Sequence, residues 1–242
     1  MQQNNVQLIL LPGMDGTGVL FRPLLETLPE NIEARVITYP CDKDKGYPEL
    51  TEYVKGKLPK ERNFILIAES FSGPIAYSIS SNPPKNLKSV IFVATFINTP
   101  NRFLWLLEKL PLPLILKLPI PIFFIKRLLL GKNAKHQNIK LLKEAINKTD
   151  SETLANRIRE MLYIPVEENK ILVPSAYLAA GNDKLVPHRN IKEFMRIAPK
   201  IEIIMIDGPH FLLQESPKEC GIEIMRILEQ SPQDVVRDEL QH

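Results

Sequence analysis

The chain has 242 residues, of which 44% are hydrophobic and 24% charged, a balance typical of a globular protein with one large domain. The 31 basic and 28 acidic residues give a net charge of +3. No basic stripe interleaved with aromatic residues occurs, so nucleic-acid binding is not expected. The cysteines, Cys41 and Cys220, lack a CxxC spacing and a histidine cluster, which argues against a zinc site and leaves a single disulfide open. We expect no metal ion and no organic cofactor.

No segment of the sequence predicts a signal peptide or a membrane span. The N-terminus has no basic stretch, and the apolar run from Leu8 to Leu11 ends at Pro12-Gly13. The most apolar stretch, 103–130, is interrupted by charged residues and prolines, so it predicts short apolar helices rather than one spanning helix. We therefore expect a cytoplasmic protein.

Six short apolar runs predict buried parallel strands, because strands covered on both faces are rich in Val, Ile and Leu and show little alternation. In chain order the runs are Val6–Leu11, Ala34–Thr38, Phe64–Ala68, Ser89–Val93, Val173–Ala179 and Ile201–Ile206. The segments of helical period between them are Val19–Leu28, Glu49–Leu58, Phe71–Ser81, His188–Ile197 and Pro217–Leu228. This alternation predicts an α/β fold with a doubly wound, mostly parallel six-stranded sheet.

One connection is far longer than the others. Roughly 75 residues separate the fourth predicted strand from the fifth, well beyond a normal crossover. This segment holds the apolar stretch and two amphipathic helical patterns, at Gln137–Lys148 and Ser151–Tyr163. We expect a helical cap over residues 98–170, inserted into a core formed by residues 1–97 and 171–242. The polar tail after Gln230 is expected to fray.

The third apolar run leads directly into AESFSG (68–73), and a helical pattern follows. A serine on a sharp strand-to-helix turn has the geometry of a nucleophile elbow. The turn needs small neighbours, which Ala68, Ser72 and Gly73 provide, and the following helix N-terminus points free N–H groups at developing negative charge. These features make Ser70 a candidate nucleophile, with a plain helix N-cap as the alternative.

The first apolar run ends in LPGMDGTG (11–18). In a hydrolase sheet the loop after this strand supplies one oxyanion donor, which by position is the N–H of Met14, paired with the N–H of Phe71. Glycines allow the backbone to approach a bound carbonyl closely, although they could equally be turn residues. The spacing GxxGxG differs from the GxGxxG of a dinucleotide loop, and the second run lacks a terminal acid for a ribose.

A serine nucleophile needs a base, and His210 is the candidate among four histidines. It follows the last apolar run through a Gly-Pro turn, at the sheet edge where ligands bind in open α/β sheets. His242 is the terminal residue, His136 lies among lysines in the expected cap, and His188 stands at an expected helix start. The alternative for His210 is an ordinary loop histidine.

The base needs an acid that fixes its tautomer, and Asp183 follows the fifth apolar run at the same sheet edge. Asp207 is the competitor, but it directly precedes the histidine turn and would more naturally stabilise that loop. A turn former or helix cap is the alternative interpretation of Asp183. The three candidates lie after three different strands in the order Ser, Asp, His, which is the order of α/β hydrolases.

The segments LPGMDGTG, AESFSG, AGNDKLVP and GPHFLLQESP together resemble the oxyanion, nucleophile, acid and histidine segments of the α/β-hydrolase superfamily, along nearly the whole chain. The resemblance implies nucleophile Ser70, acid Asp183, base His210 and oxyanion donors Met14 and Phe71. The N-terminal half, with TYPCDKDKGYPELTEYV, more narrowly resembles bacterial hydrolases of undefined substrate and the hydrolase-like part of plant plastid phytyl-ester and diacylglycerol acyltransferases. The sequence has AxSxS where the family commonly has GxSxG, and Leu-Pro-Gly where many members have His-Gly.

These patterns predict a serine hydrolase of the carboxylesterase or thioesterase type, which cleaves a small-molecule ester or thioester through an acyl-enzyme. The apolar cap favours a lipophilic acyl or alcohol group, and its mixture of basic and apolar residues is compatible with peripheral membrane contact. Three alternatives stay open. The chain could transfer the acyl group to an alcohol or thiol acceptor, or it could bind a small molecule without catalysis. It could also be a membrane-surface interaction module in which the cap is the functional part.

Overall fold

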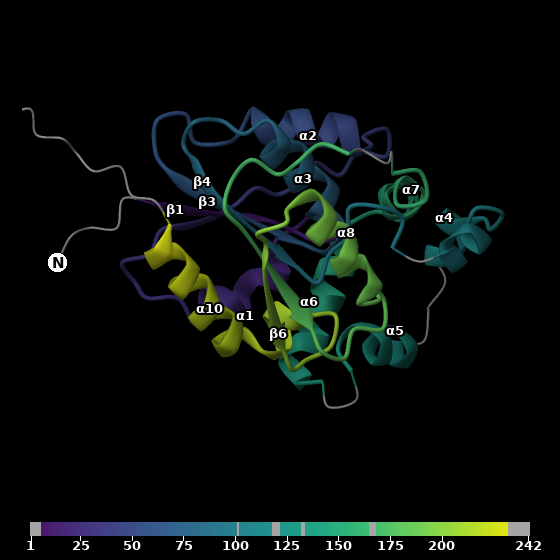
Figure 1. Cartoon of the computed structure of the whole chain (residues 1–242). Coiled ribbons are helices and arrows are strands. Elements are labelled where there is room, and N and C mark those ends of the chain that lie inside the picture. Colours follow the sequence, from purple (N-terminus) through teal and green to yellow (C-terminus); the bar gives the residue numbers. More distant parts are fainter. Residues whose placement is uncertain (1–5, 101, 118–121, 132–133, 165–167, 232–242) are drawn as a thin grey trace, which may run out of the picture.

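The computed structural model describes residues 6–100, 102–117, 122–131, 134–164 and 168–231. Its centre is a six-stranded sheet in the order β2-β1-β3-β4-β5-β6, and all five neighbouring pairs are parallel. The strands are β1 (Gln7–Leu11), β2 (Ala34–Val36), β3 (Phe64–Glu69), β4 (Leu87–Val93), β5 (Ser175–Ala180) and β6 (Glu202–Ile206). The predicted α/β architecture is confirmed, with helices on both faces of the sheet (Figure 1).

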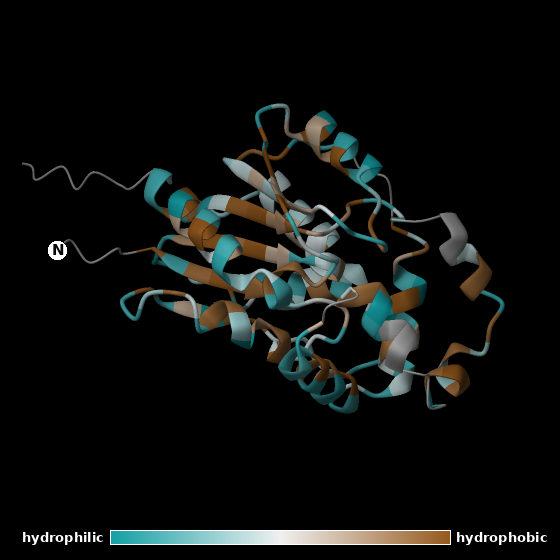
Figure 2. Cartoon of the chain, turned by 90° about the horizontal axis from the view of Figure 1, so that it is seen from below, coloured by the Kyte–Doolittle hydropathy of each residue, from teal (hydrophilic) through white to brown (hydrophobic). Residues whose placement is uncertain are grey.

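Each face of the sheet has its own apolar layer, because successive side chains of a strand point to opposite faces. One layer joins the sheet to α2 (Tyr47–Lys55), α3 (Gly73–Ser81) and α8 (Arg189–Ile197). The other layer joins it to α1 (Arg22–Leu25), α9 (Leu212–Glu215) and α10 (Pro217–Gln230). Figure 2 shows the apolar strands in the interior and hydrophilic residues on the outer sides of the surrounding helices.

The two edge strands differ from the expectation that all six strands are buried. Every residue of β1 and β3 is buried, whereas β2 is partly exposed and β6 has exposed residues at Glu202 and Met205. An edge strand has a neighbour on one side alone, so fewer contacts cover it. The prediction of complete burial was therefore wrong for these two strands.

Several element boundaries shift for local reasons. β5 begins at Ser175 rather than Val173, since Pro174 has no N–H to donate to the ladder. The helix expected over Val19–Leu28 is a 3₁₀ turn, η1 (Val19–Phe21), followed by the single turn of α1. The Thr27 hydroxyl, which donates to the Leu24 carbonyl at 2.7 Å, helps to end that turn.

The strand order places the site. The chain runs from β1 outward to β2, then returns to β3 on the other side of β1, so the direction of winding reverses between β1 and β3. In open α/β sheets, ligands bind at the carboxyl ends of the two strands that flank such a reversal. The loop after β1 and Ser70 after β3 therefore meet at this edge.

The described part of the 98–170 segment, which lies between β4 and β5, consists of helices joined by loops. The helices are η3 (Arg102–Leu107), α4 (Leu112–Lys117), α5 (Ile122–Leu129), α6 (His136–Asn147) and α7 (Ser151–Glu160). α4 and α5 lie at the margin of the molecule, whereas α6 packs on η1 through an apolar cluster that includes Ala145 and Val19 (Figure 1). None of the helices in the described part of the chain has the length and apolar character needed to cross a membrane. The expected fraying of the C-terminal tail concerns residues that, apart from Ser231, lie outside the described ones.

Candidate active site

Ser70 stands on a strained turn between a strand and a helix. It opens the 3₁₀ turn η2 (Ser70–Ser72), which joins β3 directly to α3, and its φ is +47°. A residue with a side chain adopts this left-handed region at an energetic cost, so the surrounding structure must enforce it. The Thr95 hydroxyl contributes by donating a hydrogen bond to the Ser70 carbonyl.

The tight packing around the turn explains why the neighbours of Ser70 are small. A Cβ added at Gly73 would overlap the Phe96 carbonyl oxygen, so only glycine fits there. Ser72 replaces the glycine of the common motif, and its buried hydroxyl donates to the Pro12 carbonyl while sharing a hydrogen bond with the Tyr39 hydroxyl. Because Ser72 has a single proton to donate, Tyr39 is the donor in that second bond. Serine in place of glycine at position 72 thus adds a hydrogen bond between the turn that carries Ser70 and the loop after β1.

His210 reaches Ser70 from the loop between β6 and α9. Its Nε2 lies 2.8 Å from the Ser70 Oγ, and its Nδ1 lies 2.8 Å from the Asp183 Oδ2. The His210 and Asp183 side chains are each 3% exposed. With Nδ1 donating its proton to the carboxylate, Nε2 presents its lone pair to the serine hydroxyl. The structure therefore brings these three predicted residues into one hydrogen-bonded chain.

The carboxylate of Asp183 is held by its own loop after β5. Its second oxygen, Oδ1, accepts hydrogen bonds from the N–H groups of Leu185 and Val186, each at 2.8 Å. These two bonds orient the carboxylate so that Oδ2 faces the imidazole. The competitor Asp207 instead accepts a hydrogen bond from the Asn182 amide at 2.7 Å, which ties together the loops after β5 and β6.

The remaining described histidines lie elsewhere. His188 precedes α8, and its Nε2 is 2.9 Å from the Ala180 carbonyl oxygen. His136 is exposed at the start of α6. His242 lies outside the described residues. Among those described, His210 alone is hydrogen-bonded to Ser70.

The loop of residues 12–17, which we call the oxyanion loop, lies directly beside Ser70. A Cβ added at Gly13 would be 4.0 Å from the Ser70 Cβ. The Gly16 N–H donates to the Gly13 carbonyl at 3.0 Å, and because the two ends of a peptide unit point in opposite directions, the Met14 N–H faces away from that turn. The Phe71 N–H belongs to the first turn of a helix, where N–H groups have no partner within the helix. Both N–H groups are thus available to an acceptor.

Sequence reasoning missed a buried acid beside the serine. Glu69 is 3% exposed, and its carboxylate accepts a hydrogen bond from the Gln214 amide at 2.9 Å. Burial is the largest cause that raises the pKa of Glu69, to about 7. The signal in the sequence was an acidic residue at the end of the apolar run FILIAE, which forms β3, a strand buried along its whole length.

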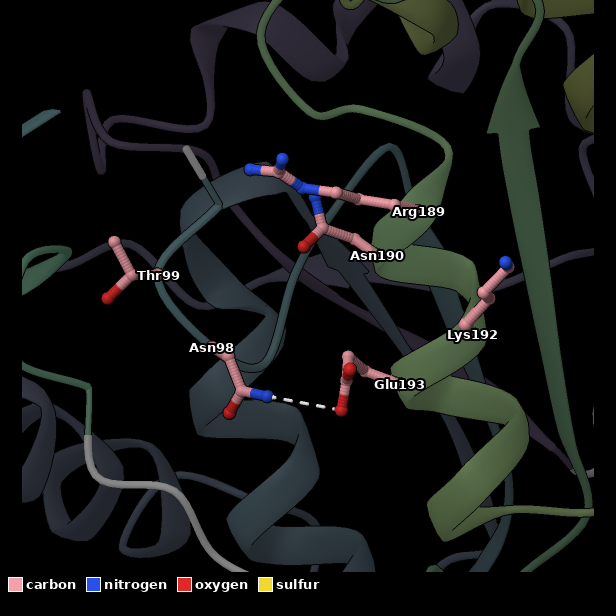
Figure 3. A pocket seen from close by; sticks show the side chains of 6 residues that line it. All are labelled: Asn98, Thr99, Arg189, Asn190, Lys192 and Glu193. Carbon is pink, nitrogen blue, oxygen red and sulfur yellow. Dashed lines mark hydrogen bonds between the residues drawn. The ribbon is translucent and has the colours of Figure 1, made fainter. Parts of the chain in front are cut away.

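A polar hollow opens between the loop after β4 and α8 (Figure 3). It is lined by Asn98, Thr99, Arg189, Asn190, Lys192 and Glu193. The Asn98 amide donates to the Glu193 carboxylate across it at 3.4 Å. None of Ser70, Asp183 and His210 lines this hollow, so it is separate from these three residues.

Cys41 is exposed and Cys220 is buried, and both are free thiols, so the disulfide that the sequence left open is not formed. No group of three or more His, Cys, Asp or Glu side chains in the described ranges is placed to hold a metal ion.

The parallel sheet order, the two helical layers and the site at the reversal between β1 and β3 are those of the α/β-hydrolase fold, and this chain has that fold. An enol-lactonase from Burkholderia xenovorans LB400 matches with a TM-score of 0.74 and 12% identity, over 95% of this chain and 94% of its own. A lipase-esterase related protein from Clostridium acetobutylicum ATCC 824 matches with a TM-score of 0.73 and 16% identity, over 93% and 95%. An esterase from Exiguobacterium antarcticum matches with a TM-score of 0.74 and 12% identity, over 92% and 91%. Neither a protein-family model nor a curated protein matches the sequence.

Proposed function

We propose that this chain is a serine hydrolase that cleaves a carboxylic ester or thioester. The observation that carries the proposal is the chain of two 2.8 Å contacts from Ser70 through His210 to Asp183, built on a turn where Ser70 has a φ of +47°. The names of the three structural neighbours, two esterase-type proteins and a lactonase, support ester chemistry on this fold.

In the acylation step, the Ser70 Oγ bonds to the acyl carbonyl carbon while His210 Nε2 takes the hydroxyl proton. The carbonyl oxygen becomes an oxyanion, which accepts hydrogen bonds from the N–H groups of Met14 and Phe71. Asp183 stabilises the imidazolium without taking its proton. The bond to the leaving alcohol or thiol then breaks, and His210 returns the proton to the leaving group.

In the deacylation step, water occupies the place of the departed alcohol or thiol. His210 Nε2 removes one proton from the water as its oxygen bonds to the acyl carbon, and the same two N–H groups hold the second oxyanion. Collapse of this intermediate breaks the bond to Ser70 Oγ, which regains its proton from His210. The products are the free acid and the enzyme in its starting state.

The 98–170 segment is our proposed cap, and it supports a lipophilic substrate. Its described part exposes many large apolar side chains, namely Trp105, Leu106, Leu110, Leu114, Leu128 and Tyr163. Substrate sites that bind acyl chains are lined mainly by apolar side chains.

The cationic residues Lys109 and Lys117 lie among the exposed apolar side chains of the cap, a mixture that also fits peripheral contact with an anionic lipid surface. Co-sedimentation with anionic vesicles, lost in Trp105→Glu and unchanged in Lys60→Glu on the core domain, tests that contact.

The decisive experiment is turnover of p-nitrophenyl esters of graded acyl length by wild type, Ser70→Ala and the control Ser81→Ala. Removal of the nucleophile should lower kcat by on the order of 10³-fold or more, whereas Ser81, at the end of α3, should be dispensable. An optimum at long acyl chains supports the lipophilic substrate. Full turnover by Ser70→Ala would disprove the assigned nucleophile.

A fluorophosphonate probe separates the alternatives. Wild type should be labelled stoichiometrically at Ser70, because the probe reports an activated serine independently of the leaving group. Labelling without ester turnover would indicate acyl transfer to a specific acceptor, and adding alcohols or thiols should then yield a new ester or thioester. A folded wild-type chain that is neither labelled nor active would indicate non-catalytic binding.

A further inference from the structure

Arg157 is a charged side chain where the helical pattern of α7 calls for an apolar one. It is 2% exposed and lies on the inward face of α7 with Leu154 and Thr153. Burial lowers the pKa of Arg157, yet a guanidinium stays charged in proteins. A buried charge is strongly destabilising unless it is hydrogen-bonded. The hydrogen-bond partners of this guanidinium therefore explain how its charge is tolerated in the interior.

The partners of Arg157 are backbone carbonyls in the loops after β1 and β2. Nη1 donates to the Met14 carbonyl at 2.7 Å, and Nη2 donates to the Pro40 carbonyl at 2.9 Å. The guanidinium also lies 5.7 Å from the centre of the Tyr39 ring, a cation–π distance. No ion pair between the described residues includes Arg157; carbonyl dipoles and an aromatic face contact the guanidinium, and the nearby carboxylates of Asp15 and Asp150 also favour its charged form.

The oxyanion loop is held through its carbonyl oxygens. Those of residues 12–16 accept, in order, from the Ser72 hydroxyl, the Gly16 N–H, Arg157, the Thr149 hydroxyl and the Tyr39 N–H. Arg157 and Thr149 both belong to the 98–170 segment. The bond to the Gly13 carbonyl orients the peptide before Met14, and the bond from Arg157 orients the peptide after it. Met14 is thus fixed on both sides, and with it the direction of its N–H.

The shape of the loop also fits the guanidinium. Gly16 has a φ of +72°, and a Cβ added there would lie 2.6 Å from the Arg157 Nη1. Any larger residue at position 16 would push the guanidinium away from the Met14 carbonyl. Glycine at position 16 therefore permits the left-handed turn and also leaves the space that the Arg157 guanidinium occupies.

We propose that Arg157 is a positioning residue, which reaches from the helical segment onto the oxyanion loop and holds the Met14 N–H aimed at the oxyanion. The inference rests on the proposed serine hydrolase function. An oxyanion donor acts mainly on the tetrahedral state, in which the negative charge has developed. Loss of Arg157 should therefore lower kcat and leave KM nearly unchanged.

The test compares Arg157→Met and Arg157→Lys with wild type and with Arg159→Met, an exposed arginine two residues further along α7. Arg157→Met should lower kcat for a p-nitrophenyl ester about 10- to 100-fold, with KM within about 2-fold of wild type. Arg157→Lys, which keeps the charge but cannot span two carbonyls, should lose less, and Arg159→Met should behave as wild type. An alkyl boronic acid, which forms a tetrahedral anion on the serine, should bind Arg157→Met weaker by the same factor as kcat falls. A ketone of the same chain length that stays unbonded to the serine should bind unchanged.

The outcomes distinguish a failure of the positioning role from a failure of the proposed function. Wild type that neither turns over esters nor reacts with the fluorophosphonate overturns the function. Active wild type with unchanged kcat and boronic acid affinity in folded Arg157→Met and Arg157→Lys overturns the positioning role. If thermal unfolding shows that Arg157→Met does not fold, Thr149→Val removes the neighbouring hydrogen bond to the Asp15 carbonyl, and it should lower kcat in the same selective way. An equal loss of affinity for the boronic acid and the ketone would indicate general disruption of the pocket and contradict the proposal.

Discussion

Two neighbouring residues at the end of β3 have different environments. The Ser70 hydroxyl faces His210 at the sheet edge, whereas the Glu69 carboxylate turns inward and accepts a hydrogen bond from Gln214. Alternation of side chains along a strand places consecutive residues on opposite sides, so an acid next to the elbow enters the core. Its pKa of about 7 is the consequence of that burial.

Glu69 should make the fold less stable as the pH rises. Its pKa is raised from 4.5 in the unfolded chain to about 7 in the folded one, so between these values the unfolded chain releases a proton that the folded chain keeps. Stability therefore falls across this window, by about 3 kcal/mol in total. Glu69→Gln removes this ionisation while keeping an acceptor for Gln214. We expect its stability relative to wild type, from urea unfolding, to rise by about that amount between about pH 4 and about pH 8. The exposed Glu61→Gln serves as the control, and a gain independent of pH would contradict this account.

The start of α7 holds the helix that carries Arg157. Asp150 caps it, because its Oδ1 accepts from the N–H groups of Glu152 at 3.0 Å and Thr153 at 2.8 Å. Its Oδ2 accepts from the Cys41 thiol at 2.8 Å, which links the helical segment to the loop after β2. These hydrogen bonds hold the pKa of Asp150 well below its usual range. One carboxylate thus caps the helix and attaches it to the core.

Asp150→Ala should destabilise the protein by about 1 kcal/mol, the usual effect of removing an acidic N-cap. Asp150→Asn should lose much less, because an amide oxygen accepts the same two backbone N–H groups. Equilibrium unfolding in urea measures both changes. The cap interpretation fails if the alanine and asparagine variants are equally stable.

The molecule as a whole is held by two apolar layers that meet the sheet from either side. Phe194 of α8 is fully buried in one of them, with its ring centre 4.7 Å from that of Phe92 on β4 and 4.9 Å from that of Tyr177 on β5. The next residue, Met195, is 53% exposed. Two neighbouring residues of one helix are therefore expected to contribute very differently to the stability of the core.

Phe194→Ala should lower the free energy of unfolding by about 3 to 5 kcal/mol, since it leaves a cavity between two strands and a helix. Met195→Ala should change it by less than about 0.5 kcal/mol, because its side chain is already in solvent. Both values come from the same urea titration. A small loss in Phe194→Ala would mean that the layer repacks around the missing ring.

The strands and the candidate site residues were accessible from the sequence because each leaves a local signal. Strands covered on both faces appear as short apolar runs, and a polar residue at the carboxyl end of such a run must lie at one edge of a parallel sheet. That rule predicted that Ser70, Asp183 and His210 lie at the same edge of the sheet, and their residue types and chain order indicated a hydrolase site. Their hydrogen bonds agree in geometry with the hypothesis, and the Ser70→Ala experiment tests their roles.

The features that sequence reasoning missed depend on contacts between distant parts of the chain. The pKa of Glu69 follows from its burial next to Gln214, which lies in α9, and the partners of Arg157 lie in the loops after β1 and β2. An arginine on an amphipathic helix reads as a solvated residue until the helix is docked. Which strands form the sheet edges is likewise a property of the packed molecule. A run of residues defines which helix or strand it can form, whereas the burial and the hydrogen-bond partners of a side chain are decided only when these elements pack together.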